Sequence, residues 1–221
     1  MTIGRAGFQY HPTTTPGKLN IIKWQESAVH QVYNKTKFTG KGVSIPGHHS
    51  QLARHRDELL SYGIAEENQI MVDWTFDLYM DLRREAQRIG FKGKVFWADL
   101  ITVVKSLWKN GEQVDVIDFD DIGHLSQKHV DLLKEACKHN VKVFIGVFAT
   151  RGARGGLNNF QQYWKNFFNM KPYRHWRGNM TYKLRDLQGM VVGHVARSQN
   201  YRSQYKEYKG RSTMVSCVVT K

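Results

Sequence analysis

The stretch "VDVIDFDDIGHLSQKHVDLLKEACKHNVKVFIGVFAT", residues 114–150, decides the fold. It opens with an apolar run over 114–120 and closes with a second one over 141–150, both rich in β-branched and aromatic residues. The residues between them, 126–140, have helical spacing, and Ser126 stands where an N-cap is expected. A strand, a helix and a second strand in this order predict a βαβ unit with parallel strands.

The same alternation extends towards the N-terminus. Strands are expected at 42–46, 69–74 and 94–100, and helices at 20–35, 50–64, 76–90 and, as helix or turn, 101–111. In the second of these helices, Leu52, Leu59 and Leu60 are expected on one side, and glycines 63 and 90 are expected to end the second and third helices. The strands are continuous apolar runs, which is typical of a parallel sheet that is covered on both faces.

Beyond residue 156 the pattern changes. We expect a helix at 158–168 and strands at 189–197 and 212–221, which would finish the sheet as an antiparallel pair. The predicted fold class is therefore α/β: a Rossmann-like, mostly parallel sheet with helices on both faces and an antiparallel C-terminal strand pair.

The length of 221 residues fits one well-packed domain. We expect three parts: a basic N-terminal arm and helix (1–40), a Rossmann-like core (41–156), and a basic, aromatic-rich region (157–221) that completes the sheet. The formal net charge of +14 is unevenly divided, with +4 in residues 1–40, −2 in 41–150 and +12 in 151–221. A slightly acidic core and a strongly basic C-terminal region suggest that the latter faces a polyanion.

The basic residues of the C-terminal region alternate with aromatic rings, as in "YWKNFFNMKPYRHWRGNMTYKLR" (163–185) and "NYRSQYKEYKGR" (200–211). This mixture favours nucleic acid, slightly RNA over DNA, above a merely solvated surface or a membrane. The "RGARGG" segment could clamp phosphate through its arginines or serve as a linker. The expected nucleic-acid contacts are Arg151, Arg154, Lys171, Arg174, Trp176, Arg177, Lys183 and Arg202.

The two cysteines, Cys137 and Cys217, lie far apart and form no metal-binding motif, so we expect a reducing, cytoplasmic environment. The longest apolar run is about half the length of a membrane-spanning helix, and the N-terminus lacks the apolar segment of a signal peptide. The sequence thus predicts a soluble intracellular protein with no membrane partner. Membership of a larger assembly stays open.

Three successive predicted strands end on acidic residues: Asp73, Asp99, and the pair Asp120 and Asp121. In open α/β sheets ligands bind outside the carboxyl ends of the strands, so these carboxylates predict one shared site. Each of them could instead cap the helix that follows, because Asp is a favoured N-cap.

Over residues 40–150 the order of these features resembles the class I S-adenosylmethionine-dependent methyltransferases. The segment 114–150 is most similar to the tRNA guanine-N2 dimethyltransferases, in which an "IDxDPxG" loop precedes a helix and a strand that ends in Thr. The resemblance implies a methyltransferase that acts on nucleic acid at an exocyclic base amine, with S-adenosylmethionine as its cofactor.

The resemblance also implies a role for each residue. Asp120 and Asp121 would be catalytic, with Asp120 orienting the target amine and drawing off its positive charge. The cofactor would be held by Pro46, Gly47, His48, Asp73, Trp74, Asp99 and Asp118. In this set Gly47 allows close backbone approach, Asp73 accepts the ribose hydroxyls, and Asp99 accepts the adenine amine. No metal is implied.

Several alternatives stay open. The turn "SIPGHHS" (44–50) has one glycine and two histidines where the family has two or three glycines, and Ile122 replaces the family's stacking aromatic. A catalytically inactive nucleic-acid-binding or assembly protein is therefore the second interpretation. A metal-dependent nuclease that uses Asp118, Asp120 and Asp121, or a haloacid-dehalogenase-type phosphatase, is a further one.

Overall fold

A computed structural model describes residues 16–34, 36–46, 48–120, 125–149, 180–209 and 213–221. Their helices are α1 (Pro16–Tyr33), α2 (Leu52–Ser61), α3 (Phe76–Ile89), α4 (Leu100–Lys109), α5 (Gln127–Lys138) and α7 (Met180–Ser198). The strands are β1 (Lys41–Ser44), β2 (Gln69–Asp73), β3 (Lys94–Trp97), β4 (Val114–Asp120), β5 (Val143–Ala149), β6 (Arg202–Lys209) and β7 (Thr213–Thr220). Short 3-10 turns, His49–Gln51 and Glu66–Asn68, precede α2 and β2.

The strands form one seven-stranded sheet in the order β3-β2-β1-β4-β5-β7-β6. The first five strands are parallel, whereas β7 runs antiparallel to both β5 and β6. The expected Rossmann-like, mostly parallel sheet with an antiparallel C-terminal pair is confirmed. The order reverses between β1 and β4, which is the switch point where such sheets bind ligands.

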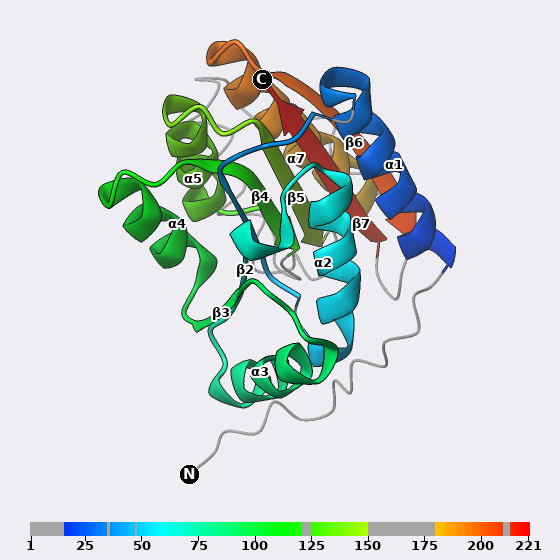
Figure 1. Ribbon diagram of the computed structural model, residues 1–221. Helices are drawn as coiled ribbons and strands as arrows, with labels where there is room; N and C mark the ends of the chain where they lie inside the picture. The colour runs from blue at the N-terminus through cyan, green and yellow to red at the C-terminus, as the bar shows by residue number, and fades with distance from the viewer. Residues whose placement is uncertain (1–15, 35, 47, 121–124, 150–179, 210–212) are drawn as a thin grey trace.

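The sheet lies between two layers of helices (Figure 1). On one face α1, α2 and α3 pack against a cluster that includes Met71, Val116 and Ile145. On the other face α4, α5 and α7 pack against a larger cluster that includes Ile117 and Phe144. Alternation along the strands therefore sends successive residues such as Val116 and Ile117 into different apolar layers, and both faces of the sheet are buried.

Local signals fixed most of the boundaries as the sequence predicts. Ser126 is the N-cap of α5, and its backbone N–H donates to His129 Nδ1 at 2.9 Å. Gly90 ends α3 in the left-handed region at φ 65°, and Gly63 follows α2 at φ 94°. Both positions need a positive φ, which glycine adopts without steric cost.

The predicted strand at 189–197 is wrong, because these residues lie inside helix α7. Val191, Val192, Val195 and Ala196 are all buried, and their spacing is helical, so they form one stripe against the sheet. The β-branched valines favoured a strand, but helical packing decided the outcome. The second strand of the C-terminal antiparallel pair is instead β6, a polar segment for which no strand was predicted.

Leu60 also departs from the expectation. Leu52 and Leu59 are fully buried, but Leu60 is 44% exposed. It follows Leu59 by one residue and therefore points about 100° away around the helix, beyond the edge of the buried stripe. The predicted helix at 158–168 lies outside the described residues.

Candidate functional site

The carboxyl ends of β2, β1 and β4 lie at one level of the sheet. Ser44 of β1 pairs with Met71 of β2 and with Asp118 of β4. Asp73 and Asp120 each lie two residues further along their strands, so they occupy the same level. With two inter-strand spacings between them, their backbones are about 10 Å apart. The fold thus brings these two predicted site residues to the same edge.

Asp73 is almost buried, with 3% of its surface exposed, although it ends the strand. Its Oδ1 accepts a hydrogen bond from the backbone N–H of Thr75 at 2.7 Å. Burial raises the pKa of Asp73, and the hydrogen bonds from Thr75 counteract the rise only in part. A further hydroxyl donor would therefore stabilise the ionised carboxylate.

Asp99 lies beside Asp73, because the neighbouring Ala98 N–H donates to the Asp73 carbonyl at 3.1 Å. Its carboxylate is the N-cap of α4, with Oδ1 accepting from the N–H groups of Ile101 at 2.9 Å and Thr102 at 3.2 Å. The Thr102 hydroxyl also bonds to the second oxygen. The capping role that was one alternative for this residue is therefore present, and the side chain is also exposed at the edge of the sheet.

Three exposed aromatic rings lie next to these carboxylates. Trp74 is 59% exposed, Phe76 50% and Trp97 58%. The Trp97 indole N–H donates to the Trp74 carbonyl at 3.0 Å, and the rings of Phe76 and Trp97 meet edge to face at 4.9 Å. We name Trp74, Phe76 and Trp97 the aromatic cluster. Exposed large rings are costly in water, so a grouped set at a strand edge is typical of a ligand surface.

Of this cluster only Trp74 was among the predicted site residues. The sequence did contain a signal for the other two, because each ring stands within three residues of a strand-ending aspartate, in "DWTF" and "WAD". Only the pairing of Asp73 with Trp97 in adjacent strands shows that the rings belong together.

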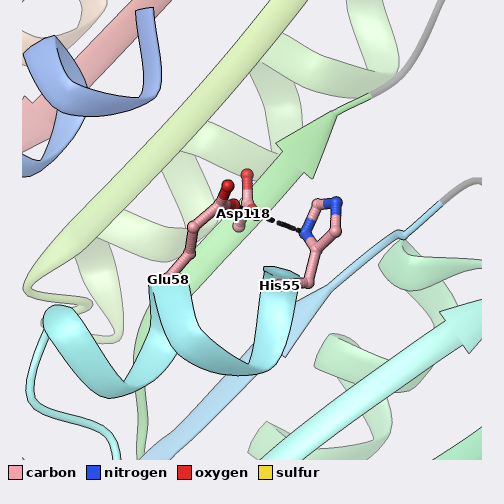
Figure 2. A group of neighbouring side chains, drawn as sticks. All are labelled: His55, Glu58 and Asp118. Carbon is pink, nitrogen blue, oxygen red and sulfur yellow. Dashed lines mark hydrogen bonds and ion pairs between the residues drawn. The ribbon is translucent and has the colours of Figure 1, made fainter. Parts of the chain in front are cut away.

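Asp118 is buried like Asp73, with 4% of its surface exposed. Its carboxylate accepts hydrogen bonds from Ser44 Oγ at 2.8 Å and from His55 Nδ1 at 3.1 Å. Figure 2 shows His55 and Glu58 of α2 pointing at Asp118 across the sheet face. Asp118 is thus held inside the protein, and these partners, together with Ser44, were not predicted as site residues.

The turn after β1 is described in part. Pro46 is buried, and His48 is partly buried with its Nδ1 2.8 Å from the Ser50 hydroxyl. Gly47 lies outside the described residues. The side chains of Asp120 and Lys183 lie outside them as well, although their backbones belong to β4 and α7.

Most of the predicted nucleic-acid contacts lie outside the described residues, namely Arg151, Arg154, Lys171, Arg174, Trp176 and Arg177. Asp121, the second predicted catalytic residue, lies outside them as well. Arg202 is described and exposed, at the start of β6. It pairs with Thr220, which pairs with Val143 at the start of β5. Arg202 therefore lies at the amino-terminal edge of the parallel strands, opposite Asp73.

No protein-family model matches the sequence, and comparison with curated proteins finds no significant relative. Among solved structures, a methyltransferase (MTase) domain of METTL16 superposes with a TM-score of 0.52 at 13% identity, covering 93% of this chain and 68% of that one. A second, delta-N METTL16 domain gives 0.50 at 12% identity, with 94% and 83% covered. A SAM-dependent methyltransferase from Agrobacterium tumefaciens gives 0.49 at 13%, with 93% and 62% covered.

The chain has a class I S-adenosylmethionine-dependent methyltransferase-like fold. The expected resemblance is thereby confirmed at the level of the fold. In this methyltransferase-like sheet, the predicted cofactor and catalytic residues lie at or directly after the carboxyl ends of β1, β2, β3 and β4. None of the described helices is long and apolar enough to cross a membrane.

Proposed function

We propose that this protein is an S-adenosylmethionine-dependent methyltransferase that acts on nucleic acid, at an exocyclic amine of a base. One observation carries the proposal: Asp73, Asp99 and the aromatic cluster gather at the carboxyl-end edge of a methyltransferase-like sheet. Acceptors beside stacking surfaces are what a nucleoside-like ligand requires.

The chemistry of these residues fits the cofactor. Its adenosine part offers two ribose hydroxyls and an amine as donors, and ionised carboxylates only accept hydrogen bonds. Asp73, desolvated and with a raised pKa, suits the hydroxyls, and the exposed Asp99 suits the amine. Trp74 offers an exposed ring for the adenine face. The buried Pro46 with Gly47 and His48 would line the remaining part. The cofactor supplies a methyl group bound to a sulfonium sulfur, which makes it electrophilic.

Asp120, with Asp121 after it, would act on the nucleic-acid substrate. The backbone of Asp120 ends the central strand β4 about 10 Å from that of Asp73, with β1 between the two strands, so a cofactor bound over the end of β1 would lie within reach of both residues. A carboxylate at this point would accept a hydrogen bond from the target amine and orient its lone pair. Such a step depends on positioning and electrostatics, so one well-placed acceptor suffices.

The charge distribution supports a nucleic-acid substrate. Residues 151–221 carry +12 of the net charge of +14, interleaved with aromatic residues. Lysine and arginine contacts to phosphates release counterions, so binding should weaken steeply with salt. Arg151, Arg154, Lys171, Arg174, Trp176, Arg177, Lys183 and Arg202 are the proposed contacts, and RNA is favoured slightly over DNA.

One observation favours a second candidate, a nucleic-acid-binding protein without catalytic activity. Both carboxylate oxygens of Asp99 already accept hydrogen bonds from α4, so the residue has a structural role that needs no cofactor. The turn at 44–50 also holds one glycine. A protein of this kind would bind RNA or DNA but not the methyl donor, either alone or as part of a larger assembly.

A transfer assay separates the two candidates. Protein is incubated with labelled S-adenosylmethionine and with single- or double-stranded RNA and DNA, and label in nucleic acid is counted. The proposal predicts label on at least one of these substrates, and none with Asp120→Ala. Salt-sensitive binding of nucleic acid with no cofactor binding would identify the second candidate, and binding that does not respond to salt would contradict both.

A further inference from the structure

A buried polar network joins the start of α2 to the centre of the sheet. We name it the α2 network, and its members are Ser44, Gln51, Arg54, His55, Glu58 and Asp118. The side chains come from β1, β4 and α2 together with the turn before it. Ser44 has no exposed surface, His55 has 1%, and Asp118 has 4%.

The hydrogen bonds settle which nitrogen of His55 carries its proton. Arg54 Nη2 lies 2.7 Å from His55 Nε2, and a guanidinium can only donate. Nε2 is therefore the acceptor, and the proton is on Nδ1. That N–H lies 2.7 Å from Ser44 Oγ and 3.1 Å from Asp118 Oδ2, so it donates towards both strands. A neutral His55 thus links an arginine on one side to a carboxylate on the other.

Arg54 supplies the positive charge of the network. Its Nη1 forms an ion pair with Glu58 at 2.6 Å, and its Nε donates to Gln51 at 2.7 Å. Burial raises the pKa of Glu58, and the charge of Arg54 counteracts part of the rise. Buried charged networks cost desolvation energy, and apolar residues often replace them without loss of stability. Their usual benefit is to fix one arrangement of the segments that they join.

The joined segments are the ones that border the proposed site. Ser44 is the last residue of β1, two residues before Pro46, and Asp118 lies two residues before Asp120. His55 lies in the first helical turn of α2, and this helix directly follows the segment 45–51 after β1. The network therefore binds both ends of the turn that follows β1 to the strand that carries Asp120.

We propose that His55 is a positioning residue, which holds the end of β1, the end of β4 and the start of α2 at fixed spacing, so that the turn after β1 and Asp120 stay aligned. The importance of this alignment for ligand binding rests on the proposed function, whereas the mechanical role of His55 does not. His55, Glu58 and Asp118 have ligand atoms within 4.8 Å of one another, which a metal ion would also require. We favour the positioning role because Arg54 lies 2.7 Å from His55 Nε2 and 2.6 Å from Glu58 and so balances the carboxylates without an ion.

Three variants and a control test the proposal. His55→Leu removes the hydrogen bonds of the ring to Arg54, Ser44 and Asp118, and His55→Asn keeps an N–H near the position of Nδ1. Ser44→Ala removes the hydroxyl that joins the two strands and changes the volume least. The control is His30→Leu, because His30 Nε2 bonds to the Ser61 carbonyl at 2.8 Å and so ties α1 to the far end of α2.

Hydrogen exchange is measured first, with no ligand. The proposal predicts that amides in peptides covering 43–46 and 116–120 exchange about tenfold faster or more in His55→Leu and Ser44→Ala. His55→Asn should recover much of the protection, and His30→Leu should leave these peptides unchanged. Equal exchange in the wild type and in Ser44→Ala, or equal acceleration in the control, would overturn the positioning role.

Calorimetry with S-adenosylhomocysteine is measured second. His55→Leu should bind about tenfold more weakly than His30→Leu when both are equally folded. A wild-type protein that binds no S-adenosylhomocysteine but shows the exchange pattern would contradict the proposed function and leave the role of His55 standing. Binding of one equivalent of Zn²⁺ or Mn²⁺ to the wild type, and its loss in His55→Asn, would overturn the assignment in favour of a metal centre.

Discussion

Asp99 offers a sharp test because it can be separated into a helix cap and a ligand acceptor. Oδ1 accepts from the backbone N–H groups of Ile101 and Thr102, whereas Oδ2 bonds to the Thr102 hydroxyl and is the oxygen that an adenine amine would share. In Asp99→Asn the amide oxygen keeps the cap, and the amide nitrogen takes the place of Oδ2. Asp99→Ala loses both.

The expected magnitudes follow from these contacts. Loss of an N-cap costs about 1 kcal/mol, which lowers the melting temperature of a domain of this size by about 2–4 °C, while Asn caps as well as Asp. A hydrogen bond to a charged group contributes about 1.5–3 kcal/mol, equivalent to roughly 10- to 150-fold in affinity. Asp99→Asn should therefore melt like the wild type but bind S-adenosylhomocysteine at least about tenfold more weakly.

Thermal denaturation and isothermal titration calorimetry on the same preparations measure the two effects. Asp99→Ala is the control that should lose both stability and affinity. If Asp99→Asn binds as tightly as the wild type, the residue is a helix cap and no more, and its assignment to the cofactor is refuted.

Three further predictions concern the core. Burial raises the pKa of Glu58 above its unfolded value of 4.5, so the folded state binds the proton more tightly. Protonation of Glu58 should therefore increase the free energy of unfolding as the pH falls through the raised pKa towards 4.5. Denaturant titrations at several pH values should show this increase in the wild type and not in Glu58→Gln. Burial raises the pKa of Cys137 to about 11 and of Cys217 to about 12, so neither thiol should react with iodoacetamide at pH 8 until the protein is unfolded; rapid labelling of the native protein would argue against this core. A Cβ on Gly189 would lie 2.5 Å from the Tyr205 ring. In Gly189→Ala this clash should lower the free energy of unfolding by about 1–3 kcal/mol, and the better helix propensity of alanine should offset about 1 kcal/mol of that loss. The loss should vanish in a Tyr205→Ser background.

Where local pattern and tertiary environment agree, the sequence predicts the fold well. The apolar runs around 114–120 and 141–150 are strands because both sheet faces are buried. Ser126 is the N-cap of α5 because its backbone N–H finds a hydrogen-bond acceptor in His129, three residues further along the chain. The stretch at 189–197 could not be assigned in this way. Its valines are typical of a strand. Their helical spacing becomes favourable only because α7 packs its buried side against the sheet.

The site shows the same limit. Strand-ending aspartates were visible in the sequence, and the sheet register brings Asp73 and Asp120 to one level. The α2 network was not visible, because His55 and Asp118 are 63 residues apart and meet only when α2 packs across β1 and β4. Contacts between side chains that are so far apart in the chain produce no local pattern in the sequence.

Binding of S-adenosylhomocysteine to the wild type, Asp73→Ala and Asp77→Ala, measured by calorimetry, tests the central claim most directly. Asp77 is an exposed acidic residue in the first turn of α3, four residues from Asp73, and is the matched control. The account predicts one saturable site in the wild type and in Asp77→Ala, and at least about tenfold weaker binding in Asp73→Ala. No saturable binding to the wild type, or equal binding to all three proteins, would contradict it.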